Sequence, residues 1–309
     1  MNNLLSIVGG NLPADDRSVR LFHGRGKKLP GFEHVTIDFY KPTLLITLFK
    51  EVSPALMDTI LQSVVEIPAE NILIQKRFLS RPVLEVFKGS IPDFAVAIEG
   101  ALKFNLKFGE FQNIGFFLDM YLGRKWLESM SANKNILNLF SYTCSLSVAA
   151  MKGGASQVVN VDMSKAALSA GAENHRLNNI SLKNVKFFPY DVMNSWGRIA
   201  KPGPYDIVII DPPTNQGDSF KVERDYYKIV KRLWDMTTDD ALIMACLNSP
   251  HLKSNFFIDL FSEYAPEFEF QKVIHSAFHS MEQDAEEGLK IVVFKRATRA
   301  TLDIKTPKE

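Results

Sequence analysis

The chain has 309 residues, of which 46% are hydrophobic and 23% charged, with a formal net charge of +1. This composition is typical of a globular protein of about two domains and argues against a purely electrostatic binder of nucleic acid. The apolar runs are too short for a membrane span, and the first residues are not expected to form a signal peptide. The two cysteines favour a reducing cytoplasm. Because the sequence has no CxxC or HExxH pattern, no metal site is expected.

The first distinctive segment, residues 17–28, is basic and contains no acidic residue. "RSVRLFHGRGKK" places the rings of Phe22 and His23 among its five cations, which are Arg17, Arg20, Arg25, Lys27 and Lys28. Such a segment can follow a phosphate backbone while its rings stack on bases, so the five cations are candidate RNA-binding residues. A solvated surface loop accounts for the same pattern equally well.

Residues 1–108 are predicted to form a small α+β domain that binds RNA or another substrate. Residues 33–50 contain two β-rich runs around the turn at Lys41 and Pro42, and Ser53 followed by Pro54 is typical of a helix start. The remaining elements are expected as a helix over 54–66 and strands near 71–77, 83–87, 94–98 and 101–107.

From residue 109 to residue 309 the pattern changes to alternating strands and helices. This alternation predicts an α/β domain with a doubly wound parallel sheet covered by helices on both faces. Strands are expected over 135–140, 157–162, 185–191, 205–211, 241–249, 268–276 and 289–295, and helices over 117–131, 145–154, 164–179 and 224–236.

Four of the predicted strands end in polar residues. The first runs into the turn "FSYTCS" at 140–145, and the next three end on Asp162, Asp191 and Asp211. The carboxyl ends of such strands meet at one edge of the sheet, where α/β proteins bind ligands. Each acid alone could be a turn former, but three in succession favour a shared site. Pro212 and Pro213 would stiffen the loop after the last of them.

The expected ligand carries an adenosine but no phosphate. An acid about 20 residues after the first turn is suited to ribose hydroxyls, which predicts that role for Asp162 and places Asp191 and Val192 at the adenine. Dinucleotides need a glycine-rich turn for their pyrophosphate, and "FSYTCS" contains no glycine. No P-loop is present either. S-adenosylmethionine is therefore the expected cofactor, and NAD is not.

Several stretches together resemble one enzyme family. "NIGFFLDM" at 113–120, "NLFSYTCSLSVAAMKGGASQVVNVDMS" at 138–164, "YDIVIIDPP" at 205–213 and "EEGLK" at 286–290 resemble the class I S-adenosylmethionine-dependent methyltransferases that include the bacterial large-subunit ribosomal RNA cytosine-C5 methyltransferase. The resemblance covers roughly 33–295. It implies a Rossmann-like fold and a ribosomal RNA substrate. Two departures are Cys144, where the family has glycine, and the absence of room for an N-terminal PUA domain.

The resemblance also implies roles for individual residues. It puts Asp211 and Pro212 beside the transferred methyl group and the substrate. The cofactor's amino-acid end would lie among Phe140, Ser141, Tyr142 and Thr143; its ribose and adenine against Asp162, Met163, Ser164, Asp191 and Val192; and a lid of Asn113, Phe116 and Asp119 would cover it.

Cys246, in "LIMACLNSP", falls near the family's nucleophilic cysteine. Cytosine C5 becomes reactive only after a thiolate adds to C6, so this role requires a partly exposed thiol with a lowered pKa. A buried strand cysteine is the alternative. If Cys246 is inert, a nitrogen is the expected target, and a small molecule or a protein remains open as substrate. A cofactor-binding protein without turnover is a further alternative for the function. A homodimer is considered for the oligomeric state.

Overall fold

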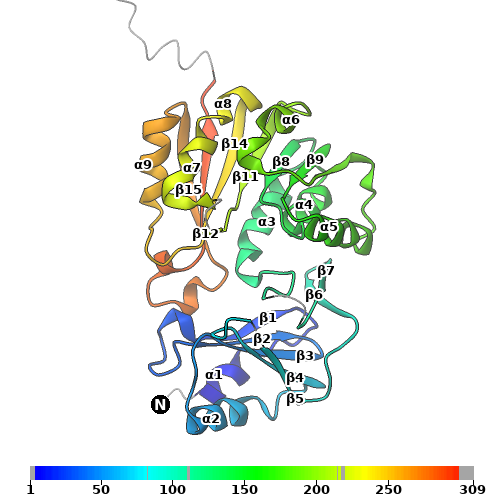
Figure 1. Ribbon diagram of the computed structural model, residues 1–309, viewed down its shortest axis with the longest axis vertical. Coiled ribbons are helices and arrows are strands. Elements are labelled where there is room, and N and C mark those ends of the chain that lie inside the picture. The colour runs from blue at the N-terminus through cyan, green and yellow to red at the C-terminus, as the bar shows by residue number, and fades with distance from the viewer. Residues whose placement is uncertain (1–3, 82, 110–111, 214, 217–219, 299–309) are drawn as a thin grey trace, which may run out of the picture. The chain divides into compact units, whose positions relative to one another are not determined.

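The computed structural model describes residues 4–81, 83–109, 112–213, 215–216 and 220–298. Two compact units make up the chain (Figure 1): unit 1 comprises Met1–Leu118 and Ala277–Ala285, and unit 2 comprises Asp119–Ser276 and Glu286–Glu309. The division therefore falls later than the predicted boundary at 108/109, and a short segment near the C-terminus returns to unit 1.

Unit 1 is built on a five-stranded sheet of order β1-β2-β3-β4-β5. Helices α1 and α2 contribute Leu4, Val8, Ile60 and Val64 to the apolar core that covers this sheet. Helix α2 begins where Ser53 accepts a hydrogen bond from the backbone N–H of Leu56 at 3.3 Å. The elements are α1 (Leu4–Gly10), β1 (Val19–His23), η1 (Gly24–Gly26), β2 (Val35–Tyr40), β3 (Thr43–Leu48), α2 (Pro54–Val64), β4 (Asn71–Lys76), β5 (Val83–Lys88) and the hairpin β6 (Ala95–Glu99) and β7 (Leu102–Leu106).

Unit 2 is a Rossmann-like α/β domain, as predicted. Its seven-stranded sheet has the order β10-β9-β8-β11-β14-β16-β15, in which the first five strands are parallel and β16 is antiparallel to both of its neighbours. The strands are β8 (Asn135–Leu139), β9 (Gln157–Val161), β10 (Val185–Phe188), β11 (Tyr205–Ile210), β14 (Thr237–Leu247), β15 (Phe268–His275) and β16 (Lys290–Arg296), with a small hairpin of β12 (Asn215–Gln216) and β13 (Phe220–Lys221).

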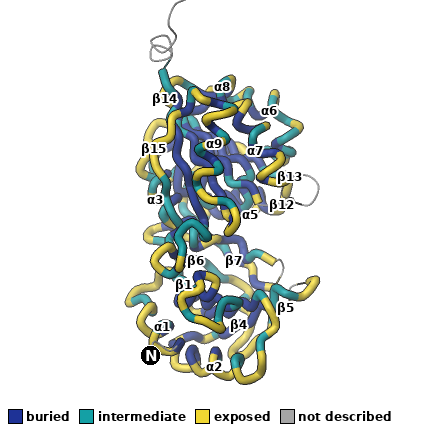
Figure 2. The backbone as a smooth tube through the Cα atoms, turned by 90° about the vertical axis from the view of Figure 1, so that its left-hand side faces the viewer, coloured by how far each residue is buried: buried dark blue, intermediate teal, exposed yellow. Residues whose placement is uncertain are grey.

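Helices cover both faces of this sheet because its central strands are apolar on both sides. Along β11, Ile207 and Ile209 pack into one buried cluster, whereas Val208 and Ile210 pack into the other. Figure 2 shows the resulting band of buried strands. The helices are α3 (Tyr121–Met130), α4 (Ser145–Lys152), α5 (Lys165–Leu177), α6 (Trp196–Ala200), α7 (Val222–Val230), α8 (Leu233–Met236) and α9 (Asn255–Tyr264). No helix in the described ranges is long and apolar enough to cross a bilayer.

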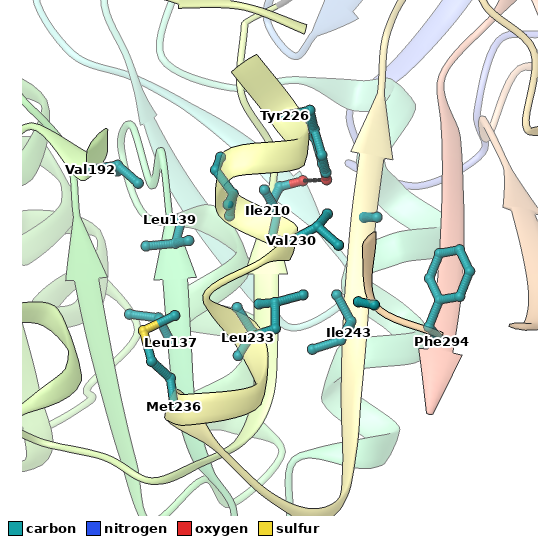
Figure 3. Close-up of a cluster of buried hydrophobic side chains, with 14 of the residues drawn as sticks. Leu137, Leu139, Val192, Ile210, Tyr226, Val230, Leu233, Met236, Ile243 and Phe294 are labelled. Carbon is teal, nitrogen blue, oxygen red and sulfur yellow. Dashed lines mark hydrogen bonds between the residues drawn. The ribbon is translucent and has the colours of Figure 1, made fainter. Parts of the chain in front are cut away.

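Helices α7 and α8 fix the end of β11. Their apolar side chains lie over the strands, and Figure 3 shows Tyr226 and Val230 next to Ile210. The hydroxyl of Tyr226, which is fully buried, donates to the carbonyl oxygen of Ile210 at 3.2 Å. The residue that follows Ile210 therefore leaves the sheet from a rigidly held position.

Candidate cofactor and active site

The chain reverses its direction of travel across the sheet between β8 and β11. From β8 it proceeds outward through β9 to β10 and then returns to β11 on the other side of β8. Neighbouring connections leave in opposite directions at such a point, which creates a crevice at the carboxyl ends of the strands. The residues that follow β8, β9, β10 and β11 are the ones that the sequence predicts as site residues.

The turn after β8 adopts left-handed backbone geometry without using glycine. Phe140, Tyr142 and Cys144 have φ values of 57°, 46° and 60°, a region that side chains other than glycine enter rarely. The backbone N–H of Ser141 donates to the carbonyl of Val161 at 3.0 Å, which ties the turn to the end of β9. Strain retained at a strand end in this way is typical of functional sites.

Asp162 closes the same turn from the end of β9. Its two carboxylate oxygens accept hydrogen bonds from the backbone N–H groups of Tyr142 and Ser164, each at 2.8 Å. Ser164 in turn caps α5 by accepting from the N–H of Ala167 at 3.1 Å. Met163, which lies between Asp162 and Ser164 in the sequence, is exposed. The half-buried carboxylate of Asp162 is therefore held at the crevice with lone pairs left for a ligand.

Asp191, at the end of β10, serves as the cap of a short helical turn. Its carboxylate accepts from the backbone N–H of Met193 at 2.8 Å and from the side-chain amide of Asn194. The side chain of Val192 is buried in the apolar core, so only its backbone can meet a ligand. The turn-forming role considered for this acid is thus present, and the predicted contact with adenine stays a prediction.

Asp211 is the most strongly perturbed acid at this edge. Desolvation by burial and the negative charge of Asp119 raise its pKa to about 7, against an opposing effect of the positive charge of Arg124. Arg124, from α3, is itself only 1% exposed. Buried Pro212 follows, which fixes the backbone beside the carboxyl group. An acid that gains and loses its proton near neutral pH is suited to accepting a proton from a substrate.

Of the two environments considered for Cys246, the structure shows the buried one. The residue lies inside β14, paired with Ile291 of β16, and its side chain is completely buried in an apolar cluster. Burial, together with the charges of Asp211 and Asp119, raises the pKa of the thiol well above its ordinary value. A thiol held in this way stays protonated, whereas addition to a base requires an accessible thiolate.

The sequence profile of the S-adenosylmethionine-dependent methyltransferases matches residues 19–295. The chain belongs to this family. S-adenosylmethionine is the family's cofactor, so the predicted cofactor, class of enzyme and fold are confirmed at the level of the family.

Curated relatives carry names that refer to ribosomal RNA. "Ribosomal RNA large subunit methyltransferase K/L" of Shewanella sp. (strain MR-4) is 36% identical over 166 residues, which are 51% of this chain and 23% of that protein. "Putative ribosomal RNA large subunit methyltransferase YwbD" of Bacillus subtilis (strain 168) is 30% identical over 247 residues, 76% of this chain and 62% of that protein. The chain thus spans less than two thirds of either relative.

Solved structures support the fold. The structure of SMU.776, described as "a putative methyltransferase complexed with SAH", matches with a TM-score of 0.84 and 22% identity over 96% of this chain and 82% of that chain. At this identity the likeness shows a shared fold alone.

The methyltransferase site fits its cofactor chemically. The hydroxyl of Ser141 is buried and lies against the thiol of Cys144, with no nitrogen or oxygen partner among the described residues, so a polar group of a ligand at the turn can bond to it. The turn is lined by side chains rather than glycines, which suits a ligand without phosphate. Asp162 then offers acceptor oxygens for ribose hydroxyls at the neighbouring strand end.

The predicted lid residues are divided between the two units. Asp119 belongs to unit 2, where its charge acts on Asp211. Asn113 and Phe116 belong to unit 1, and the ring of Phe116 is buried there in a stack on Phe104, with ring centres 4.6 Å apart. Closure over the cofactor by Asn113 and Phe116 stays a prediction.

The basic segment contains strand β1 and the turn η1, and all of its five cations except Arg20 are exposed. In β1, Arg20 lies directly opposite Asp38 of β2 and donates two hydrogen bonds to its carboxylate at 2.6 and 3.0 Å. This half-buried pair satisfies the charge of Arg20, and the predicted contact of Arg20 with RNA stays a prediction. Arg17 pairs with Asp15 on the surface, and Lys28 donates to the carbonyl of Ser280 at 2.6 Å.

A buried polar network beneath the turn escapes prediction from the sequence. The side-chain amide of Asn138 donates to Asn160 at 2.9 Å, Asn160 donates to the hydroxyl of Ser147 at 3.0 Å, and that hydroxyl lies 2.9 Å from Nε2 of His175. The four residues connect β8, β9, α4 and α5. They therefore hold the turn and Asp162 in fixed positions relative to each other.

Buried Lys290 of the "EEGLK" motif similarly donates to two carbonyl groups, those of Ser249 and Glu286.

Proposed function

We propose that this chain transfers a methyl group from S-adenosylmethionine to a nitrogen of an RNA base, and that the RNA is ribosomal. The printed names of the relatives from Shewanella and Bacillus support the substrate class. The nitrogen target is supported by Asp211, a carboxyl group with a pKa of about 7 at the end of β11, together with a thiol that is buried. The proposal retains the predicted cytoplasmic location. Dimerisation stays untested.

A nitrogen target needs little covalent help from the protein. When bound, the cofactor would supply a methyl group on a positively charged sulfur. A nitrogen of the base would take this methyl group as the carbon–sulfur bond breaks, and S-adenosylhomocysteine would leave with the electron pair of that bond. In the proposed reaction Asp211 accepts a hydrogen bond from the N–H of the base, orients that nitrogen and receives its proton as the new bond forms. Asp162 holds the ribose, and the turn after β8 holds the amino-acid end. Pro212 and Pro213 fix the backbone that follows Asp211.

The product of the reaction tests this proposal. The purified chain is incubated with labelled S-adenosylmethionine and ribosomal RNA from cells that lack the gene, and the RNA is then digested and its nucleosides separated. We expect label in a base methylated on nitrogen. Label in 5-methylcytidine would contradict the nitrogen target, and label only in protein or a small molecule would contradict the RNA substrate.

Alanine at Asp162 should weaken cofactor binding by about 1–3 kcal/mol, the usual range for a lost hydrogen bond to a charged group. Calorimetry with S-adenosylhomocysteine measures this change directly. Asp240→Ala serves as the control, because this exposed acid pairs with Lys295 toward the amino end of β14. Equal affinities of the parent and the Asp162 variant would mean that another group binds the ribose.

Alanine at Cys246 should leave methyl transfer near the parental rate. The thiol is buried and protonated, so the expected cost is a small cavity and about 1 kcal/mol of folding stability. Initial rates and thermal unfolding of the variant check both points. If the variant folds and binds cofactor but has lost turnover, or if the parent forms a covalent complex with RNA containing 5-fluorocytosine, the thiol mechanism is restored.

A further inference from the structure

Two arginines of unit 1 share a single aromatic ring. Phe49 follows β3 and Arg77 follows the adjacent parallel strand β4, where the N–H of Arg77 donates to the carbonyl of Leu48 at 2.9 Å. The guanidinium carbon of Arg77 lies 5.4 Å from the ring centre of Phe49, and that of Arg25, in η1, lies 4.7 Å from the same centre. Three separate elements therefore bring two cations to one ring.

Arg77 differs from the cations at the start of the basic segment in its surroundings. Arg17 and Arg20 each have a carboxylate partner, Asp15 and Asp38. In the part of the chain that the structure describes, Arg77 has no carboxylate within ion-pair distance and is half-buried. Burial and the positive charge of Arg25 lower its pKa. Burying a guanidinium group without a carboxylate partner is costly, so Arg77 is suited to an anionic ligand.

The backbone around Arg25 is held in place by two glycines. A Cβ atom on Gly24 would lie 1.8 Å from the carbonyl oxygen of Phe32, and one on Gly26 would lie 2.1 Å from that of Met281. Backbone therefore packs against η1 at both glycines, and Arg25 is the position between them that can carry a side chain. Its guanidinium extends from a rigid turn, which reduces the entropy lost when a ligand binds.

We propose that Arg25 and Arg77 together bind one phosphodiester of the RNA substrate, with Phe49 holding the two guanidinium planes. Planar guanidinium groups match phosphate oxygens through paired N–H donors. Both guanidinium groups already lie against this ring, so its role is to orient them rather than to stack on a base. This inference rests on the proposed function, because it assumes an RNA substrate.

Binding of a labelled transcript of large-subunit ribosomal RNA, measured over a series of salt concentrations, tests the site. Arg77→Gln and Arg25→Gln should each weaken binding about tenfold and make the salt dependence shallower by about one unit of slope. The loss of RNA affinity in the double variant should be smaller than the product of the two single losses, because both groups hold the same phosphate. Phe49→Leu should weaken binding several-fold with the slope unchanged, since it removes no charge.

Arg17→Gln is the matched control, and its effect should combine independently with that of Arg77→Gln. The KM for RNA should rise in the Arg25 and Arg77 variants while the KM for S-adenosylmethionine and the unfolding temperature remain parental. If the parent methylates RNA and both variants bind it equally well, this site is wrong and the proposed function stands. If the parent neither binds nor methylates RNA, the proposed function and this site are both wrong.

Discussion

Replacing Asp211 by asparagine is expected to lower the rate of methyl transfer by a factor of about 10²–10⁴, the range associated with loss of a positioned acid–base group. Asparagine keeps the size of the side chain but cannot receive a proton. Cofactor affinity should change much less than the rate, because Asp162 and the turn after β8 are intact. Steady-state rates and calorimetry on the same preparation separate the two effects.

The pH dependence gives a sharper test of Asp211. With a pKa of about 7, its carboxyl group is mostly protonated at pH 6 and mostly ionised at pH 8. The parental kcat/KM should therefore rise through pH 7 and level off above it, and the asparagine variant should lack this rise. Removing the negative charge with Asp119→Asn should shift the rise to lower pH, because that charge contributes to the raised pKa.

Folding stability provides the control for Asp211, and its sign follows from linkage. The pKa of this group is raised from 3.8 to about 7, so the folded chain binds more protons than the unfolded chain between these values. Its contribution to the unfolding free energy consequently falls as pH rises through that range. At pH 8, Asp211→Asn should thus be at least as stable as the parent. A variant that is both less stable and inactive would indicate a structural role for the carboxylate.

The edge at which the site forms could be predicted from the sequence, whereas the environment of each side chain could not. Strands buried on both faces give apolar runs, and their order along the chain places Asp162, Asp191 and Asp211 at one edge. A cysteine in such a run gives the same pattern whether it is buried or exposed. Cys246 is buried because it packs in an apolar cluster with residues distant in the sequence, such as Ile291.

The surroundings of charged residues escape prediction for a related reason. Arg20 in a basic segment predicts a surface cation, but its partner Asp38 is 18 residues away and is revealed only by the register of β1 against β2. Arg124 lies on a helix, yet it is buried, and its charge acts on Asp211 of the candidate site. Tertiary pairing neutralises one arginine and tertiary packing buries the other, and neither effect leaves a local pattern in the sequence.

Alanine at Gly171 should destabilise the chain and weaken cofactor binding together. Gly171 lies in α5 directly against the turn after β8, and an added Cβ atom would lie 2.4 Å from the sulfur of Cys144 and 2.9 Å from its Cβ atom. The turn would have to move, at a cost of about 1–3 kcal/mol for overpacking. Asn174, one turn further along α5, donates to the carbonyl of Thr143 at 3.0 Å, so movement there also strains this bond.

The residue at position 144 offers a rescue of the Gly171 variant. Cys144 is completely buried and has a φ of 60°, a conformation that glycine adopts without strain. Cys144→Gly removes both atoms in conflict with the new methyl group, so the double variant should regain stability and affinity. Cys144→Ala should rescue only in part, because the Cβ atom at 2.9 Å remains.

A glycine in open space provides the comparison for this series. Gly197 lies in α6, and a methyl group added there would have no heavy atom within 4 Å, so Gly197→Ala should be neutral or stabilising by about 0.4–1 kcal/mol. Denaturant unfolding and calorimetry on all of these variants measure the two properties side by side. If the single variant Gly171→Ala retains parental stability and cofactor affinity, then α5 does not constrain the turn after β8. In that case the presence of cysteine rather than glycine at position 144 does not affect the packing of α5.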